Sequence, residues 1–206
     1  MFRKFRILIL LLMVLEMLRW DARVARLAFC TLVLTGLLVL LQQLSAGFTA
    51  LPVPGEVQVD RLALAGKAVL MGCALALAVG FAHEGGFKFW MLLASTLLGG
   101  MVVLGSAGFA TLFIGIEMLS LPAFAMMVQG QRASAAGEAA FKYLLMSSVG
   151  TALLLFGMAL VYGVSGSLAI ADNARLLAGS GQARAAGLLM LSGLFVKAAV
   201  FPFHGW

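Results

Sequence analysis

The sequence predicts an all-α protein, a polytopic transmembrane bundle of about seven helices. Hydrophobic residues make up 63% of the 206 residues and charged residues only 11%, whereas soluble domains carry about 25% charge. The apolar residues form long runs, most of them near the roughly 20 residues that a helix needs to cross a bilayer. No alternating strand pattern competes with this interpretation.

Charges and Gly/Pro clusters delimit the predicted helices at 5–18, 24–44, 62–82, 87–105, 108–128, 139–163 and 185–204. The first run has the charged start and short apolar stretch of a signal peptide, but it lacks an A-x-A cleavage site. We therefore expect a short or tilted membrane helix there.

The connections and their charges indicate a membrane-embedded chain. The loop at 45–60 holds two of the four prolines and no Lys or Arg, which predicts an extracytoplasmic loop. Most basic residues stand at the ends of apolar runs, so the net charge of +6 indicates membrane interfaces and argues against nucleic-acid binding. Four aromatic residues at predicted helix ends fit an interfacial belt, although packing would also explain each: Trp20, Trp90, Tyr143 and Trp206.

No motif of a soluble enzyme is present. The chain lacks the P-loop, dinucleotide-binding and H-E-x-x-H patterns, and "GVSGSL" (163–168) lacks the spacing of a nucleophile elbow. Cys30 and Cys73 lie alone in different apolar runs, outside any Cys/His cluster. We expect neither a metal nor a cofactor to be bound by this chain.

Five ionisable residues interrupt or end the apolar runs: Lys67, Glu117, Lys142, Lys197 and His204. An ionisable group at the bilayer centre costs about 2.5–3.5 kcal/mol, so such groups usually pair with each other or face water. At 1.5 Å per residue, Glu117 and Lys197 each lie roughly 14 to 18 Å from the same membrane face. They can meet at one depth if their helices are adjacent.

The other three charges lie nearer the membrane faces. Lys142 either snorkels to the cytoplasmic face or is the next residue of a proton path after the central pair. Lys67 follows Asp60 and Arg61 closely, and we expect it to snorkel to the opposite face; the alternative is a transport role. His204 either passes protons between the membrane interior and water or is an ordinary interfacial residue.

Pro122 and Pro202 each stand five residues after a membrane charge. Each proline removes a helical hydrogen bond, to the carbonyl of Met118 or of Ala198, and is expected to bend its helix. The repeated spacing suggests a shared hydrated site, because broken membrane helices expose backbone groups to polar cavities. Two ordinary kinks would give the same pattern.

The Glu117–Lys197 pair has two interpretations from physics alone. It is either a proton or cation relay or a structural ion pair. A buried pair often contributes nothing net to stability, whereas intramembrane charges are typical of proton relays.

Three stretches resemble a known family: "LFIGIEMLSLPAFAMM", "EAAFKYLLMSSVGTALLLFGMALVYGVSGSL" and "GLFVKAAVFPFHGW". Their patterns G-I-E-x-x-S-L-P, K-Y-x-x-x-S, L-x-Y-G-x-S-G and F-x-K-x-x-x-x-P-F-H follow in that order. They are similar to those of the antiporter-like membrane subunits of respiratory complex I, the NADH–quinone oxidoreductase. The resemblance is continuous from about 85 to 206 and looser from 57.

This resemblance implies an antiporter-type fold of two inverted repeats. Residues 1–206 would form a single membrane domain, with the N-terminal helices in 1–84 and an incomplete first repeat in 85–206. The resemblance further implies a proton relay through Glu117, Lys197, Lys142 and His204. The second repeat has no counterpart in this chain, so we expect a fragment, a truncated product or half of a split subunit.

The resemblance also implies a function. We expect a proton-translocating subunit in the bacterial inner membrane, coupled to quinone reduction elsewhere in complex I. Other membrane subunits and the bilayer would be its partners, and quinone only indirectly. No flavin, iron–sulfur or nucleotide motif is present, so redox chemistry would belong to partner chains. The alternatives are a cation/proton antiporter subunit, a membrane subunit of an energy-converting hydrogenase, or a truncated scaffold that does not transport.

Overall fold

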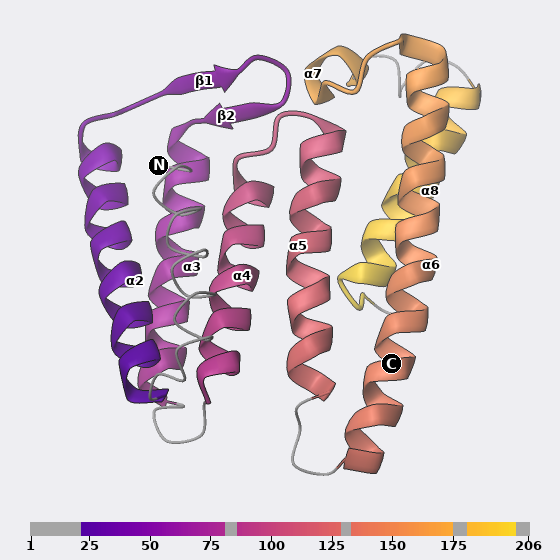
Figure 1. Cartoon of the computed structure of the whole chain (residues 1–206). Coiled ribbons are helices and arrows are strands. Elements are labelled where there is room, and N and C mark those ends of the chain that lie inside the picture. The colour runs from indigo at the N-terminus through magenta and orange to yellow at the C-terminus, as the bar shows by residue number, and fades with distance from the viewer. Residues whose placement is uncertain (1–21, 81–85, 129–132, 175–180, 201–206) are drawn as a thin grey trace. The chain divides into compact units, whose positions relative to one another are not determined.

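A computed structural model describes residues 22–80, 86–128, 133–174 and 181–200, and these residues are mostly helical (Figure 1). The long helices are α2 (Ala22–Ser45), α3 (Arg61–Gly80), α4 (Phe87–Leu104), α5 (Phe109–Val128), α6 (Ala133–Ser165) and α8 (Gly181–Lys197). Between them lie β1 (Ala50–Val53), β2 (Val57–Val59) and the short helix α7 (Ile170–Asn173). The predicted all-α transmembrane bundle is confirmed. Its first expected helix, 5–18, lies outside the described residues.

Five of the described helices are long and apolar enough to cross a membrane by length and composition: α2 from Arg23, α3, α4, α5 and α6 from Ala136. Their ends fall close to the predicted ones, because uniform hydrophobicity over about 20 residues is a strong signal. The last predicted helix is an exception. It was expected to reach residue 204, but α8 ends at Lys197.

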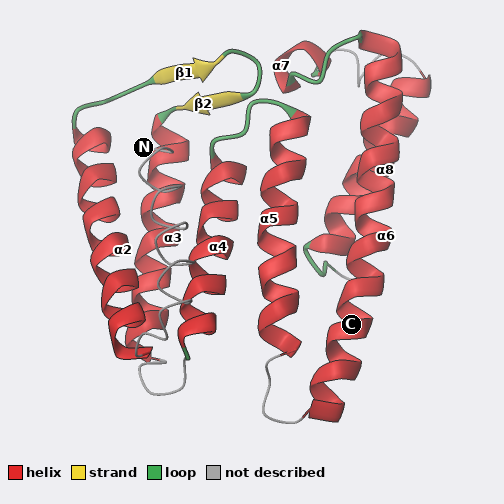
Figure 2. Cartoon of the chain, in the orientation of Figure 1, coloured by secondary structure: helices red, strands yellow, loops and turns green. Residues whose placement is uncertain are grey.

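Two elements near the helix ends were not predicted (Figure 2). One is the β1–β2 hairpin in the loop at 45–60, where Gly55 takes a left-handed conformation with φ of 78°. The other is α7, which follows α6. Strands of three and four residues and a helix of four are too short to show a periodic pattern, so the sequence could not indicate them.

The helices fall into two compact units, described separately here. The first unit holds α2, α3, α4 and the middle of α5 (Gly115–Ala123). The second holds the hairpin tip (Pro52–Gln58), the segment Ser106–Ile114, α6, α7 and α8. The expected single membrane domain, divided after residue 84, stays a prediction, and α4 groups with α2 and α3.

The core of the first unit lies where α2, α3 and α4 pack together. Trp90 is 1% exposed, with its ring 5.6 Å from that of Phe29 and 5.2 Å from that of Phe89. The expectation that Trp90 joins an interfacial belt is therefore wrong, and packing explains it instead. Burial of a large aromatic ring is a main source of core stability.

The second unit is closed at one end by a cluster of connecting segments. Ala107 N–H donates to the Glu56 carbonyl at 2.8 Å, and Ile170 N–H donates to the Ala107 carbonyl at 2.9 Å. The Thr111 hydroxyl donates to the Glu56 carboxylate, which lies beside the start of α5. An acidic group is favourable at a helix N-terminus, so Glu56 ties the hairpin tip to this segment.

Candidate functional site

Lys197 is the last residue of α8, and the chain turns immediately after it. Val200 N–H donates to the Phe195 carbonyl at 3.0 Å, and Ala199 N–H donates to the Val196 carbonyl at 3.2 Å. These two bonds and the positive φ of Ala199, 51°, form a Schellman helix end. A non-glycine residue in this left-handed region costs roughly 1–2 kcal/mol. The helix therefore stops at Lys197 through local strain, five residues before Pro202.

Glycines bring α8 very close to α6 in the second unit. A Cβ atom added to Gly193 would lie 2.7 Å from the Gly150 carbonyl oxygen, and one added to Gly157 would lie 2.8 Å from the Ala186 carbonyl oxygen. Small residues allow membrane helices to approach until their backbones touch. The spacing of Gly150 and Gly157 places both on one face of α6, and this face receives α8.

The close approach positions the Lys197 side chain against α6. Its amine Nζ donates a hydrogen bond to the Ser147 hydroxyl at 3.3 Å. Its stem lies over Gly150, where an added Cβ would be 3.0 Å from Lys197 Cγ. Both Ser147 and Lys197 are half-buried. Sequence reasoning missed this role of Ser147, although the serine of the K-Y-x-x-x-S pattern was a signal that could have found it.

Lys142 lies on an exposed face of α6. Its amine donates to the Glu138 carboxylate one turn earlier, and the two side chains are 59% and 67% exposed. The Glu-before-Lys order at this spacing favours such pairs in helices. Glu138 was readable from the sequence but was not singled out. Snorkelling and a relay role for Lys142 both stay predictions.

Glu117 is half-buried in the part of α5 that packs on α4 within the first unit. A Cβ added to Gly115 would lie 2.8 Å from the Val103 nitrogen, and one added to Gly99 would lie 2.9 Å from the Met118 carbonyl oxygen. That carbonyl is the one deprived of its helical donor by Pro122. Helix α5 nevertheless continues to Val128. The freed carbonyl therefore lies against a glycine on the neighbouring helix.

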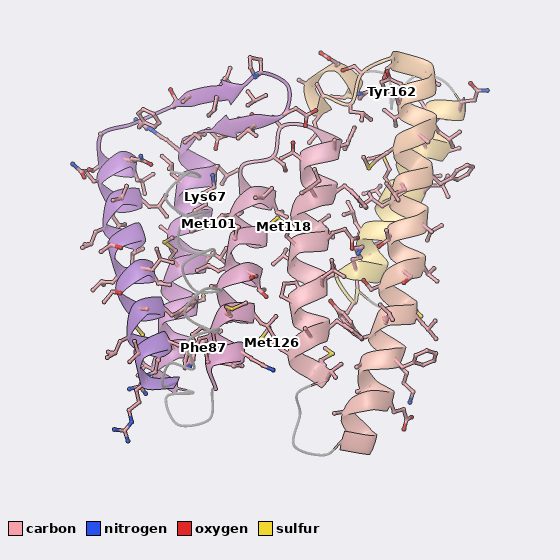
Figure 3. The ribbon with its side chains drawn as sticks, viewed as in Figure 1. Lys67, Phe87, Met101, Met118, Met126 and Tyr162 are labelled. Atoms are coloured by element: carbon pink, nitrogen blue, oxygen red, sulfur yellow. The ribbon has the colours of Figure 1, made fainter. Side chains whose placement is uncertain are left out.

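Lys67 is buried, contrary to the expectation that it snorkels out. The residue, labelled in Figure 3, is only 8% exposed. It is one of the buried residues of α3, as are Leu64 and Met71. The nearby Asp60 carboxylate interacts with it electrostatically. A lysine side chain on a helix points toward the N-terminus, so its amine lies toward Asp60 but is covered by protein.

The predicted site is thus described only in part. Glu117 belongs to the first unit and Lys197 to the second, so their pairing stays a prediction. Pro202 and His204 lie outside the described residues. Among those that the structure describes, no group of three His, Cys, Asp or Glu side chains has the arrangement of a metal site.

Known proteins share both the sequence and the fold of this chain. A family model described as NADH:quinone oxidoreductase/Mrp antiporter, TM, matches residues 106–206. NADH-quinone oxidoreductase subunit N of Pelobacter propionicus is 49% identical over 97% of this chain and 43% of its own length. Subunit N of Bacillus anthracis is 38% identical over 58% of this chain and 25% of its own length.

Solved structures agree with these relatives. A chain of respiratory complex I from Thermus thermophilus, solved with bound aureothin, matches 98% of this chain and 44% of its own length, with a TM-score of 0.85 and 28% identity. A chain of the Mrp complex from a Dietzia species covers 96% of this chain and 40% of its own length, with a TM-score of 0.82. At 24% identity this second likeness shows the fold alone.

This chain spans 43% of the length of its Pelobacter relative. The membrane-spanning helices and these relatives together establish a multi-pass membrane protein. The chain belongs to the family of antiporter-like membrane subunits shared by NADH:quinone oxidoreductase and Mrp antiporters.

Proposed function

We propose that this chain is part of a subunit-N-like, proton-translocating component of NADH–quinone oxidoreductase in the bacterial inner membrane. The observation that carries the proposal is the placement of Lys197. Its amine is half-buried at the strained end of a helix and is held by the Ser147 hydroxyl. A half-buried lysine in a membrane protein is by default a candidate for a proton pathway.

In this proposal the chain moves protons and performs no redox chemistry. Glu117, Lys197, Lys142 and His204 form the relay, and the backbone carbonyls that lose their helical donors to Pro122 and Pro202 supply polar groups beside it. Electron transfer and quinone reduction take place in partner subunits, so quinone acts on this chain only indirectly. A change in the Glu117–Lys197 interaction would release or capture the lysine proton, because a nearby carboxylate favours the charged amine.

The test replaces Lys197 by Met and Glu117 by Gln in the chromosomal copy of the gene. Inverted membrane vesicles are then assayed for NADH-driven proton uptake and for quinone reduction. Both variants should lower proton uptake at least tenfold. Lys88→Met and Asp172→Asn serve as controls, because both residues are exposed and lie outside the relay. Wild-type proton uptake in both relay variants would refute the proposal.

A cation/proton antiporter subunit is the second candidate, because the matching family also covers Mrp antiporters. The same vesicles distinguish the two. Proton uptake that requires NADH and is independent of sodium supports the oxidoreductase. Proton movement driven by a sodium gradient without NADH supports the antiporter.

A further inference from the structure

We propose that Ser147 is a positioning residue that holds the Lys197 amine in both of its protonation states. The inference deepens the proposed function and rests on it, since it assigns Ser147 a part in proton transfer through Lys197. Ser147 acts through the lysine, and it is not itself assigned a place among the groups that exchange protons.

The geometry of α6 places Ser147 within reach of the Lys197 amine. Ser147 and Gly150 lie about one turn apart on the face of α6 that receives α8. The stem of Lys197 crosses Gly150, and its amine ends 3.3 Å from the Ser147 oxygen. A side chain at position 150 would displace this stem. Gly150 therefore leaves space for the lysine stem, and Ser147, one turn earlier, binds its amine.

Hydroxyl groups close to Ser147 on α6 donate to carbonyl groups of their own helix. The Ser148 hydroxyl donates to the Leu144 carbonyl at 2.7 Å, and the Thr151 hydroxyl donates to the Ser147 carbonyl at 3.0 Å. Such bonds to a carbonyl one turn earlier are the usual hydrogen bonds of Ser and Thr hydroxyl groups within a helix. The Ser147 oxygen accepts a bond from a different helix. That bond crosses 50 positions of the sequence.

A hydroxyl group can bind both the charged and the neutral form of the Lys197 amine. A hydroxyl group has one donor and two acceptor positions. It accepts from the ammonium form of lysine and, after the proton has left, can donate to the lone pair of the neutral amine. A carboxylate partner would hold only the charged form well. Ser147 therefore keeps the amine in place while the proton comes and goes, without favouring one state as strongly as an ion pair does.

Lys197 lies at the C-terminal end of its own helix, α8. Because α8 ends at Lys197 in a strained turn, the residue has less helix to fix it on its C-terminal side. A long side chain loses much rotamer freedom when it is held in one geometry. The contact with Ser147 supplies this restraint from α6 instead of from α8.

The test measures the freedom of the amine directly. The full 206-residue chain is purified in detergent, labelled briefly with acetic anhydride at fixed pH, and the acetylation of Lys197 is followed by mass spectrometry. Ser147→Ala should raise the acetylation rate about fivefold, as expected for the loss of one modest hydrogen bond. Ser148→Ala is the matched control and should leave the rate unchanged, because the Ser148 side chain is exposed.

Ser147→Thr separates positioning from packing. It keeps the hydroxyl and should restore the wild-type acetylation rate, whereas Ser147→Cys, of similar size but with a weaker hydrogen bond, should not. Circular dichroism and thermal unfolding establish that each variant is folded. If Ser147→Ala fails to fold, the Thr and Cys variants decide the question. Equal acetylation of Lys197 in folded wild type and in the folded Ala or Cys variant would overturn the proposal.

Vesicle assays distinguish failure of this inference from failure of the proposed function. Ser147→Ala should lower proton uptake several-fold and Ser147→Thr should recover it. If Lys197→Met abolishes uptake while Ser147→Ala pumps at the wild-type rate, Ser147 does not position the lysine for transfer. If Lys197→Met pumps normally, the proposed function is refuted, and the acetylation result alone then shows whether Ser147 holds the amine.

Discussion

The close contact between α6 and α8 predicts that a larger residue at position 193 would destabilise the chain. Replacing this residue by Ala adds one methyl group at the point of closest approach. The new Cβ would lie 2.7 Å from the Gly150 carbonyl oxygen, 2.9 Å from the Leu154 nitrogen and 3.2 Å from the Leu154 Cβ. Two of these three atoms belong to the backbone of α6, so no side-chain rotation relieves the clash.

The magnitude follows from these distances. An ordinary contact begins at 3.4 Å, so the helices must separate by about 0.7 Å from the present 2.7 Å. If the amine moves with α8, its distance to the Ser147 oxygen grows from 3.3 Å to about 4.0 Å, beyond hydrogen-bonding reach. Overpacking of this kind typically costs about 1–3 kcal/mol. We expect Gly193→Ala to destabilise the chain by that amount and to release Lys197.

The assay combines thermal unfolding in detergent, followed by circular dichroism, with acetylation of Lys197. Gly163→Ala is the control, because Gly163 lies inside α6, the helix that α8 contacts, and an added Cβ there would meet nothing within 4 Å. Alanine is favoured over glycine inside a helix by about 0.5–1 kcal/mol, so the control should be slightly stabilised. A Gly193→Ala variant with wild-type stability and unchanged acetylation would show that the two helices are not held by backbone contact.

Two further predictions concern single residues. Ala199→Gly should stabilise the chain by about 1 kcal/mol in the same unfolding assay, because glycine adopts the left-handed conformation without a steric penalty; Ala198→Gly is the control, and equal effects at the two positions would contradict the strained helix end. Lys67→Met should leave stability unchanged or raise it by about 1–2 kcal/mol, because an apolar side chain of similar length replaces a buried charge. A large loss of stability on that change would instead make the electrostatic attraction between Lys67 and Asp60 an important support of the first unit.

The membrane-spanning helices were predictable because their signal is additive. About 20 apolar residues in a row favour a spanning helix whatever their order, and charges and prolines mark the ends. The end of α8 was not predictable in this way. Pro202 suggested a break, but the turn occurs at Ala199, where a non-glycine residue adopts a positive φ. Such strain persists only when surrounding contacts stabilise it.

Burial of individual charges was also beyond the sequence. Lys67 and Lys142 both stand a few residues inside apolar helices, yet Lys67 is buried and Lys142 is exposed beside Glu138. In a nearly uniform apolar helix there is no polar face to show which side meets protein and which meets lipid. The outcome depends on which neighbouring helix covers each position.

The amino-acid sequence alone identifies this chain as a helical membrane protein of the antiporter-like family and marks Glu117 and Lys197 as unusual charges. These conclusions rest on composition, on run length and on short local patterns, each of which is contained in neighbouring residues. That Lys197 lies over Gly150 and binds Ser147 is known only from the fold, because that contact joins two helices about 50 residues apart. The contact forms because glycines let the backbones of α6 and α8 touch. This packing of two helices is a long-range property that no local sequence pattern encodes.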